Sequence, residues 1–159
     1  MKNAIFILIG FLSGATVVFL FTRKMNAQEY FTESESIYGF EETVAQFESI
    51  VNDTPDWKVL KTYDLQESMK KSGFSVQAVK VFSLCNPDYS SKILFSNQER
   101  VVTSMMPCRL SIYIKTDGKT YISRMNSAEM ASKMGGLVDK VMSSASNDME
   151  SMIADLIKK

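Results

Sequence analysis

The sequence contains no histidine among its 159 residues. This absence excludes Ser-His-Asp and Cys-His nucleophilic catalysis, histidine ligation of metals and the covalent haem motif. The carboxylates are spread along the chain, and none forms a spaced pair that would supply a general acid and a general base. A non-enzymatic role is therefore favoured over the familiar classes of hydrolase.

The chain also lacks a net charge and a dense basic segment. Its 18 basic residues balance 18 acidic ones, and no basic run is longer than two residues, as at Lys70-Lys71. A nucleic-acid-binding domain normally carries a clustered positive patch. Nucleic acid is therefore not expected as a partner.

Charge is absent altogether from residues 4–21. At ~1.5 Å per residue in a helix, this apolar run would be about 27 Å long, enough to cross the core of a bilayer. It exceeds the usual apolar core of a signal peptide, Arg23 and Lys24 follow it, and no clear Ala-x-Ala site precedes Gln28. We predict a transmembrane anchor within residues 1–26, with a cleaved signal peptide as the alternative.

The charges on the two sides of the anchor favour opposite orientations in the membrane. Lys2 favours a cytoplasmic N-terminus, whereas Arg23 and Lys24 favour the opposite arrangement. A very short charged start followed at once by an apolar run is typical of simple export anchors. We expect a single-pass protein of a bacterial inner membrane, with the domain in the periplasm.

Residues 27–33 are polar and predict a linker, and residues 34–159 predict one α+β domain with a small, mainly antiparallel sheet and helices packed on one face. Apolar residues recur at i, i+4, i+7 and i+11 from Phe40, which predicts a helix over residues 40–52. A longer apolar face from Val138 to Leu156 predicts a C-terminal helix that packs on the sheet or on a partner.

Strands are predicted over residues 34–38, 57–63 and 76–85, and an extended run over residues 101–115. Within that run the residues from Leu110 alternate between apolar and polar types, which is typical of a half-buried strand. Asp117-Gly118 then predicts a two-residue hairpin turn, after which residues 120–124 return antiparallel. Shorter helices are predicted over residues 65–72 and after Asn126, and Trp57 is expected to be a packing residue.

The two cysteines bracket the stretch around which this domain is organised. Cys85 ends the third predicted strand, and Asn86 and Pro87 suit the N-cap and first position of a short helix. The dipole of that helix is expected to lower the pKa of the Cys85 thiol. Cys108 follows Pro107, which is expected to be an edge or bulge residue. We therefore expect the two thiols at the same end of the sheet, near enough to interact.

The motifs at residues 84–87 and 106–108, together with the hairpin over residues 110–124, resemble the family known as domain of unknown function 302. Residues 40–43 are a weaker match. The resemblance covers residues 34–157 and implies an α+β domain, a sheet with helices on one face, frequent homodimers and no agreed activity. The family often has asparagine after its second cysteine, whereas this chain has Arg109.

Three interpretations of the cysteines stay open at this point. They can form a structural or redox-labile disulfide, act as a thiol pair that carries sulfur or binds a soft metal, or serve as small buried apolar residues. Met105 and Met106 beside Cys108 invite a copper(I) interpretation. The family pattern has aliphatic residues where these methionines stand, which favours core packing instead.

From these observations we favour a membrane-anchored binding or interaction domain that forms a homodimer. Gly10 and Gly14 support self-association, because small residues at this spacing let transmembrane helices approach closely. The alternative is a thiol-dependent redox, sulfur-carrier or soft-metal-binding protein. The sequence identifies no cofactor and no specific ligand. The candidate site consists of Cys85, Asn86, Pro87, Pro107, Cys108 and Arg109.

Overall fold

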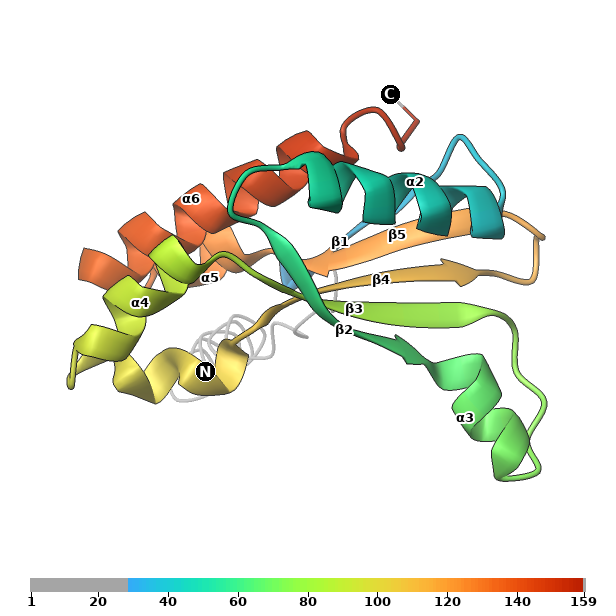
Figure 1. Cartoon of the computed structure of the whole chain (residues 1–159), viewed down its shortest axis with the longest axis horizontal. Coiled ribbons are helices and arrows are strands. Elements are labelled where there is room, and N and C mark those ends of the chain that lie inside the picture. The colour runs from blue at the N-terminus through green and yellow to red at the C-terminus, as the bar shows by residue number, and fades with distance from the viewer. Residues whose placement is uncertain (1–28, 159) are drawn as a thin grey trace, which may run out of the picture.

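The computed structural model describes residues 29–158, so the predicted anchor lies outside the described residues. Within residues 29–158 the chain forms a five-stranded sheet and several helices (Figure 1). None of the helices in this range is long and apolar enough to span a bilayer.

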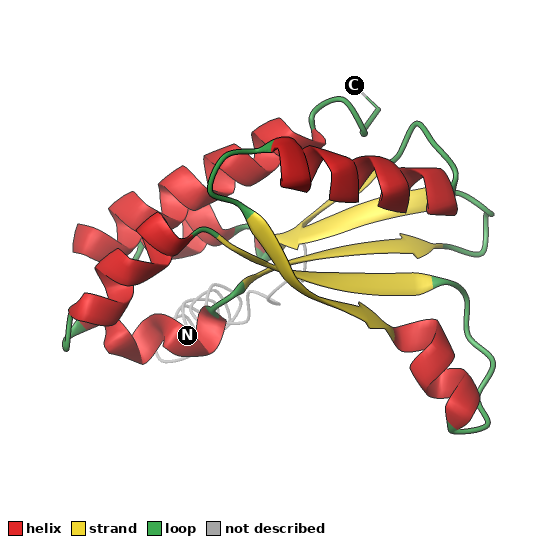
Figure 2. Ribbon diagram, viewed as in Figure 1, coloured by secondary structure: helices red, strands yellow, loops and turns green. Residues whose placement is uncertain are grey.

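Each of the first three strands is followed by a helix, and Figure 2 colours the elements by type. In chain order they are β1 (Phe31–Glu35), α2 (Phe40–Asp53), β2 (Lys58–Asp64), α3 (Leu65–Lys71), β3 (Val79–Cys85), α4 (Pro87–Phe95), the 3-10 helix η2 (Glu99–Met105), β4 (Cys108–Ile114), β5 (Thr120–Met125), α5 (Ser127–Ser132) and α6 (Gly136–Ile153).

The strands pair in the order β1-β5-β4-β3-β2, and every neighbouring pair is antiparallel. This confirms the predicted α+β class with an antiparallel sheet. Helices α2 and α6 lie together on one face of the sheet (Figure 1). Strands β1 and β2 form its two edges, so one edge of each is not paired within the described sheet.

The core lies between that face and the two helices. Phe47 of α2 packs edge-on against Phe82 of β3, with ring centroids 5.1 Å apart, and both side chains are fully buried. The periodic face predicted from Phe40 is therefore confirmed as the buried face of α2. The face predicted from Val138 to Leu156 is buried in the same chain, so α6 packs on its own domain and not on a partner.

A buried arginine joins β5 to α6. Arg124 is only 5% exposed, and its Nε and Nη2 atoms donate to the two carboxylate oxygens of Glu150 at 2.7 and 2.6 Å. Its Nη1 atom donates to the Ser34 hydroxyl at 2.9 Å. Because both ends of the guanidinium are hydrogen-bonded, a charged side chain is accommodated on the core face of the sheet.

The first strand was predicted over residues 34–38, but β1 spans Phe31–Glu35. The strand ends early because the Ser36 hydroxyl hydrogen-bonds the Thr43 hydroxyl at 2.8 Å and donates to the Leu156 carbonyl at 3.1 Å. The linker predicted over residues 27–33 is correspondingly too long, since Phe31 already pairs with Met125.

The run over residues 101–115 is not extended throughout, contrary to prediction. Its first part belongs to η2, and β4 begins only at Cys108. The Ser96 hydroxyl accepts a hydrogen bond from the Glu99 amide at 3.2 Å and so starts a new helical turn. Pro107 follows a cis peptide bond and precedes β4, so it is neither an edge nor a bulge residue of that strand.

The hairpin between β4 and β5 is confirmed, but its loop has three residues and not two. The Lys115 amide donates to the Lys119 carbonyl, while the Gly118 amide donates to the Lys115 carbonyl at 3.0 Å. Gly118 has a φ of +76°, which a residue with a side chain rarely adopts. Three-residue hairpin loops usually consist of a type I turn followed by a residue, commonly glycine, in the left-handed conformation.

Residues 60–77, from the middle of β2 through α3 to the approach to β3, form an exposed arm. Helix α3 has no buried residue and stands apart from α2 and α6 (Figure 1). The arm nevertheless carries large apolar side chains, including Leu60 at 59% and Phe74 at 64% exposure. Strand β3 begins at Val79 and not at residue 76, because residues 76 and 77 belong to the arm and the pairing with β4 starts at Val79.

Candidate functional site

The candidate site begins at the junction of β3 and α4. Cys85 is the last residue of β3, and Asn86 caps α4 because its Oδ1 atom accepts hydrogen bonds from the Asp88 amide at 2.9 Å and the Tyr89 amide at 3.3 Å. Pro87 occupies the first helical position, where its missing N–H leaves no bond unmade. The helix start predicted from these residues is confirmed.

The second half of the site is the first residue of β4. Cys108 lies directly opposite Leu84 in the antiparallel pairing of β3 with β4. Cys85 follows Leu84, so the register places the two cysteines at the same end of the sheet, as expected. Both are free thiols and both are partly buried.

Both cysteines line one small cavity of about 50 Å³. Asn86 and Pro107 line it too, so it brings together four of the six predicted site residues. None of its lining residues is charged. Three methionines join the two cysteines in the lining, and we call it the sulfur-lined cavity after Cys85, Met105, Met106, Cys108 and Met142.

The other two predicted residues lie outside the sulfur-lined cavity. Pro87 is exposed at the start of α4 and only positions that helix. Arg109 is also exposed, and it contributes to an adjoining hollow of about 20 Å³. Cys108, Met105 and Met142 line both spaces, so they separate the sulfur-lined cavity from this hollow.

An aromatic pair forms another wall of the sulfur-lined cavity. The rings of Trp57 and Tyr89 meet edge-on with centroids 6.2 Å apart. One carboxylate oxygen of Asp148 accepts hydrogen bonds from Trp57 Nε1 at 3.1 Å and from the Tyr89 hydroxyl at 3.0 Å. The hydrogen bond to Asp148, followed by burial, raises the pKa of Tyr89. Trp57 is buried and is a packing residue, as predicted, but sequence reasoning missed Tyr89 and Asp148.

The thiols have different surroundings. The Cys85 Sγ atom, at the end of β3, lies 3.1 Å from the hydroxyl oxygen of Ser90 in α4. Burial, followed by the nearby charge of Cys85, raises the pKa of the Cys108 thiol above its ordinary value. Cys108 is therefore a neutral thiol at neutral pH unless a cation binds beside it.

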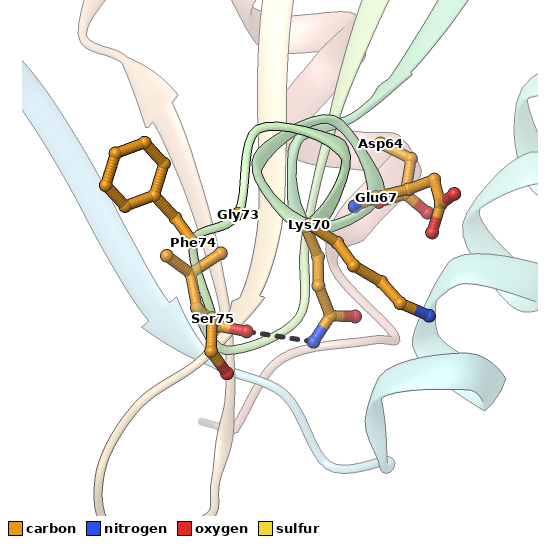
Figure 3. Close-up of a pocket in the computed structure, with 8 residues that line it drawn as sticks. Asp64, Glu67, Lys70, Gly73, Phe74 and Ser75 are labelled. Atoms are coloured by element: carbon orange, nitrogen blue, oxygen red, sulfur yellow. Dashed lines mark hydrogen bonds between the residues drawn. The ribbon is translucent and has the colours of Figure 1, made fainter.

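A larger and more open hollow of about 500 Å³ lies within the exposed arm, between α3 and the residues after it (Figure 3). Gln66 Nε2 donates to the Val76 carbonyl at 3.0 Å across its floor. The Asp64 carboxylate is already used as the cap of α3, since it accepts from the Glu67 amide at 2.8 Å. Figure 3 shows the Phe74 ring extending away from Lys70, so the lining residues do not converge on a common point.

Comparison with known proteins identifies the family. The model of the family described as "Domain of unknown function DUF302" matches residues 32–158. The chain belongs to the DUF302 family. This confirms the resemblance inferred from the cysteine motifs and the hairpin. A search of curated proteins gives no match.

A solved structure shares the DUF302 fold. The crystal structure of an uncharacterized conserved protein DUF302 from Bacillus stearothermophilus is similar with a TM-score of 0.69 and 17% sequence identity. The similarity covers 79% of this chain and 97% of that one. At this identity the likeness establishes the fold alone.

Proposed function

We propose that this protein is a membrane-anchored, non-enzymatic binding domain that takes a ligand of a few heavy atoms in the sulfur-lined cavity. The observation that carries the proposal is that both cysteines line one small, uncharged cavity. Apart from Trp57, its lining comes from the junction of β3 with α4, from η2 and the start of β4, and from α6, which are three separate parts of the chain. Ligand sites are commonly built where several elements converge in this way.

The size of the cavity limits the ligand. Sites for drug-sized molecules usually have volumes of about 300–1,000 Å³, whereas this cavity has about 50 Å³. A single water needs roughly 10–15 Å³ on the same kind of measure. The ligand is therefore an ion or a group of a few atoms, and not a nucleotide, a sugar or a peptide.

Two further parts of the proposal concern location and assembly. The uncharged residues 4–21 support anchoring in a membrane, for which we retain the periplasmic side of a bacterial inner membrane. The exposed arm supports a homodimer, because several large apolar side chains are exposed along this one segment. Strand β2 adds an edge with backbone groups available for pairing with a second chain.

Xenon tests whether the sulfur-lined cavity admits a ligand at all, since it enters small apolar cavities without needing polar partners. In xenon-pressurised protein, amide resonances of Cys85, Tyr89 and Cys108 should shift saturably. Ala145→Leu, which fills the cavity from α6, should abolish the shifts, whereas Ala154→Leu at an exposed position should not. Unchanged spectra at all xenon pressures would contradict the proposed binding function.

The alternative is a thiol-dependent redox or sulfur-carrier protein, whereas soft-metal binding, the third member of the predicted alternative, is itself a form of ligand binding in the cavity. The free state of both cysteines and their position at one end of the sheet favour this candidate. Alkylation of each cysteine in the folded protein separates the two functions. One thiol that reacts much faster than in the unfolded chain would support thiol chemistry, and two slow thiols support the binding domain.

A further inference from the structure

We propose that the ligand of the sulfur-lined cavity is a soft monovalent metal ion, with copper(I) as the representative probe. This inference rests on the proposed binding function and names the class of ligand. Cys85 and Cys108 would be the principal ligands, and one or more of the three methionines would complete the coordination.

The first argument is the concentration of sulfur. Five sulfur-bearing side chains line the one cavity, and the adjoining hollow adds Met125 and Met149. The five come from separate parts of the fold: Cys85 from β3, Met105 from η2, Met106 from the link to β4, Cys108 from β4 and Met142 from α6. Three of the five lie within residues 105–108, and the fold brings Cys85 and Met142 to them from elsewhere in the chain.

The second argument is ligand softness. Thiolate and thioether sulfur select copper(I) and chemically similar ions, whereas Zn²⁺ takes four nitrogen, thiolate or carboxylate ligands and makes little use of thioethers. The chain has no histidine, and the described residues contain no cluster of three or more histidine, cysteine, aspartate or glutamate residues suited to a metal. These residues therefore do not support a zinc site. Two thiols with neighbouring thioethers support a site for copper(I) or a similar soft ion.

The third argument is size and polarity. A cavity of about 50 Å³ accommodates a dehydrated ion, but its uncharged lining offers little to a hydrated or strongly charged ion such as Mg²⁺. Copper(I) sheds its water readily for sulfur ligands. Both cysteines are partly exposed, so an ion can reach them without global unfolding.

Core packing is the competing explanation for the methionines, since methionine fills irregular gaps in apolar cores. The two explanations predict different effects of Met→Leu substitution. Leucine keeps the apolar volume and removes only the sulfur ligand. Packing alone therefore leaves metal affinity unchanged, whereas ligation does not.

The test is an anaerobic titration of the full-length protein in detergent with copper(I) against a chromophoric copper(I) chelator, with silver(I) and Zn²⁺ in parallel. We expect one copper(I) or silver(I) per chain and no comparable zinc binding. Cys85→Ser and Cys108→Ser should each weaken copper(I) binding by about 100-fold or more, and Met106→Leu by about tenfold. Met134→Leu, at an exposed site outside the cavity, should leave the affinity unchanged.

Copper(I) binding that the double variant Cys85→Ser/Cys108→Ser retains, or no binding that competes with the chelator, would overturn the inference. The xenon experiment keeps this failure separate from failure of the proposed function. If xenon enters the cavity and copper(I) does not bind, the proposed binding function is retained and the assignment of a metal ligand is contradicted. If xenon does not enter the cavity either, both the binding function and the metal assignment are contradicted.

Discussion

At the scale of single residues, Asn86 fixes the position of Cys85. Its side chain is almost fully buried, and its Oδ1 atom accepts from two amides of the first turn of α4. The helix must therefore begin immediately after the cysteine, which brings Tyr89 and Ser90 over the sulfur-lined cavity. Substitution of Asn86 should lower the stability of the domain and make the cavity wall at Cys85 less ordered.

Asn86→Ala should lower the free energy of unfolding by about 1 kcal/mol, because two amides at the start of α4 lose their acceptor. Urea denaturation of a chain that begins at Gln28 measures this change. Asn97→Ala is the matched control, since Asn97 is exposed and caps no helix of the described chain. Equal stability of the two variants would contradict a stabilising role for the Asn86 cap.

At the scale of elements, the sheet is held to α6 by an ion pair as well as by apolar packing. Arg124 is buried on β5, whereas the Glu150 side chain on α6 is 45% exposed. Removing the carboxylate therefore leaves a charge that is only partly reached by water. The cost should be well above that of a surface pair and below that of a fully buried one.

Glu150→Ala should accordingly cost about 2 kcal/mol of unfolding free energy. Glu129→Ala removes the carboxylate of an exposed pair with Lys133 and should cost less than about 0.5 kcal/mol. Thermal and urea unfolding of the two variants in one buffer give the comparison. Similar losses in both would show that burial of Arg124 does not strengthen its pairing.

Elements defined by neighbouring residues could be predicted from the sequence. The start of α4 follows from Asn86 and Pro87, and the buried face of α2 follows from the spacing that begins at Phe40. The position of Cys85 relative to Cys108 was predictable because each adjoins a strong local signal. For the same reason, four of the six predicted site residues line the cavity.

Features that depend on distant residues could not be predicted in this way. The end of β1 is set by hydrogen bonds from Ser36 to Thr43 and to the Leu156 carbonyl, which no local pattern reveals. Asp148 joins the site only because α6 lies beside Trp57 and Tyr89 in the folded chain. The arm was missed because its helix has ordinary capping signals, and only the fold shows that it buries nothing.

At the scale of the whole molecule, the first prediction concerns the anchor. Full-length protein should sediment with membranes and resist carbonate extraction, because residues 4–21 are uncharged and long enough to span a bilayer. Leu12→Lys should cost about 3 kcal/mol of insertion free energy and release the protein. Gln28→Lys, beyond the apolar run, is the control. Wild-type protein in the soluble fraction would contradict the anchor.

The second prediction concerns assembly through the exposed arm. A chain that begins at Gln28 should be a dimer in light scattering at micromolar concentrations. Leu60→Asp combined with Phe74→Asp should give a monomer, because both apolar side chains are exposed in the single chain. Met134→Asp, at a comparably exposed apolar site outside the arm, should remain dimeric. A wild-type monomer would exclude the arm as a self-association surface.

The central claim is that the space between Cys85 and Cys108 takes a ligand. Diffraction from a xenon-pressurised crystal tests it most directly, because the anomalous signal locates each bound atom. We predict a single strong site in van der Waals contact with Cys85, Cys108 and Met142. Xenon bound only elsewhere in the domain, with the sulfur-lined cavity empty at saturating pressure, would contradict the account.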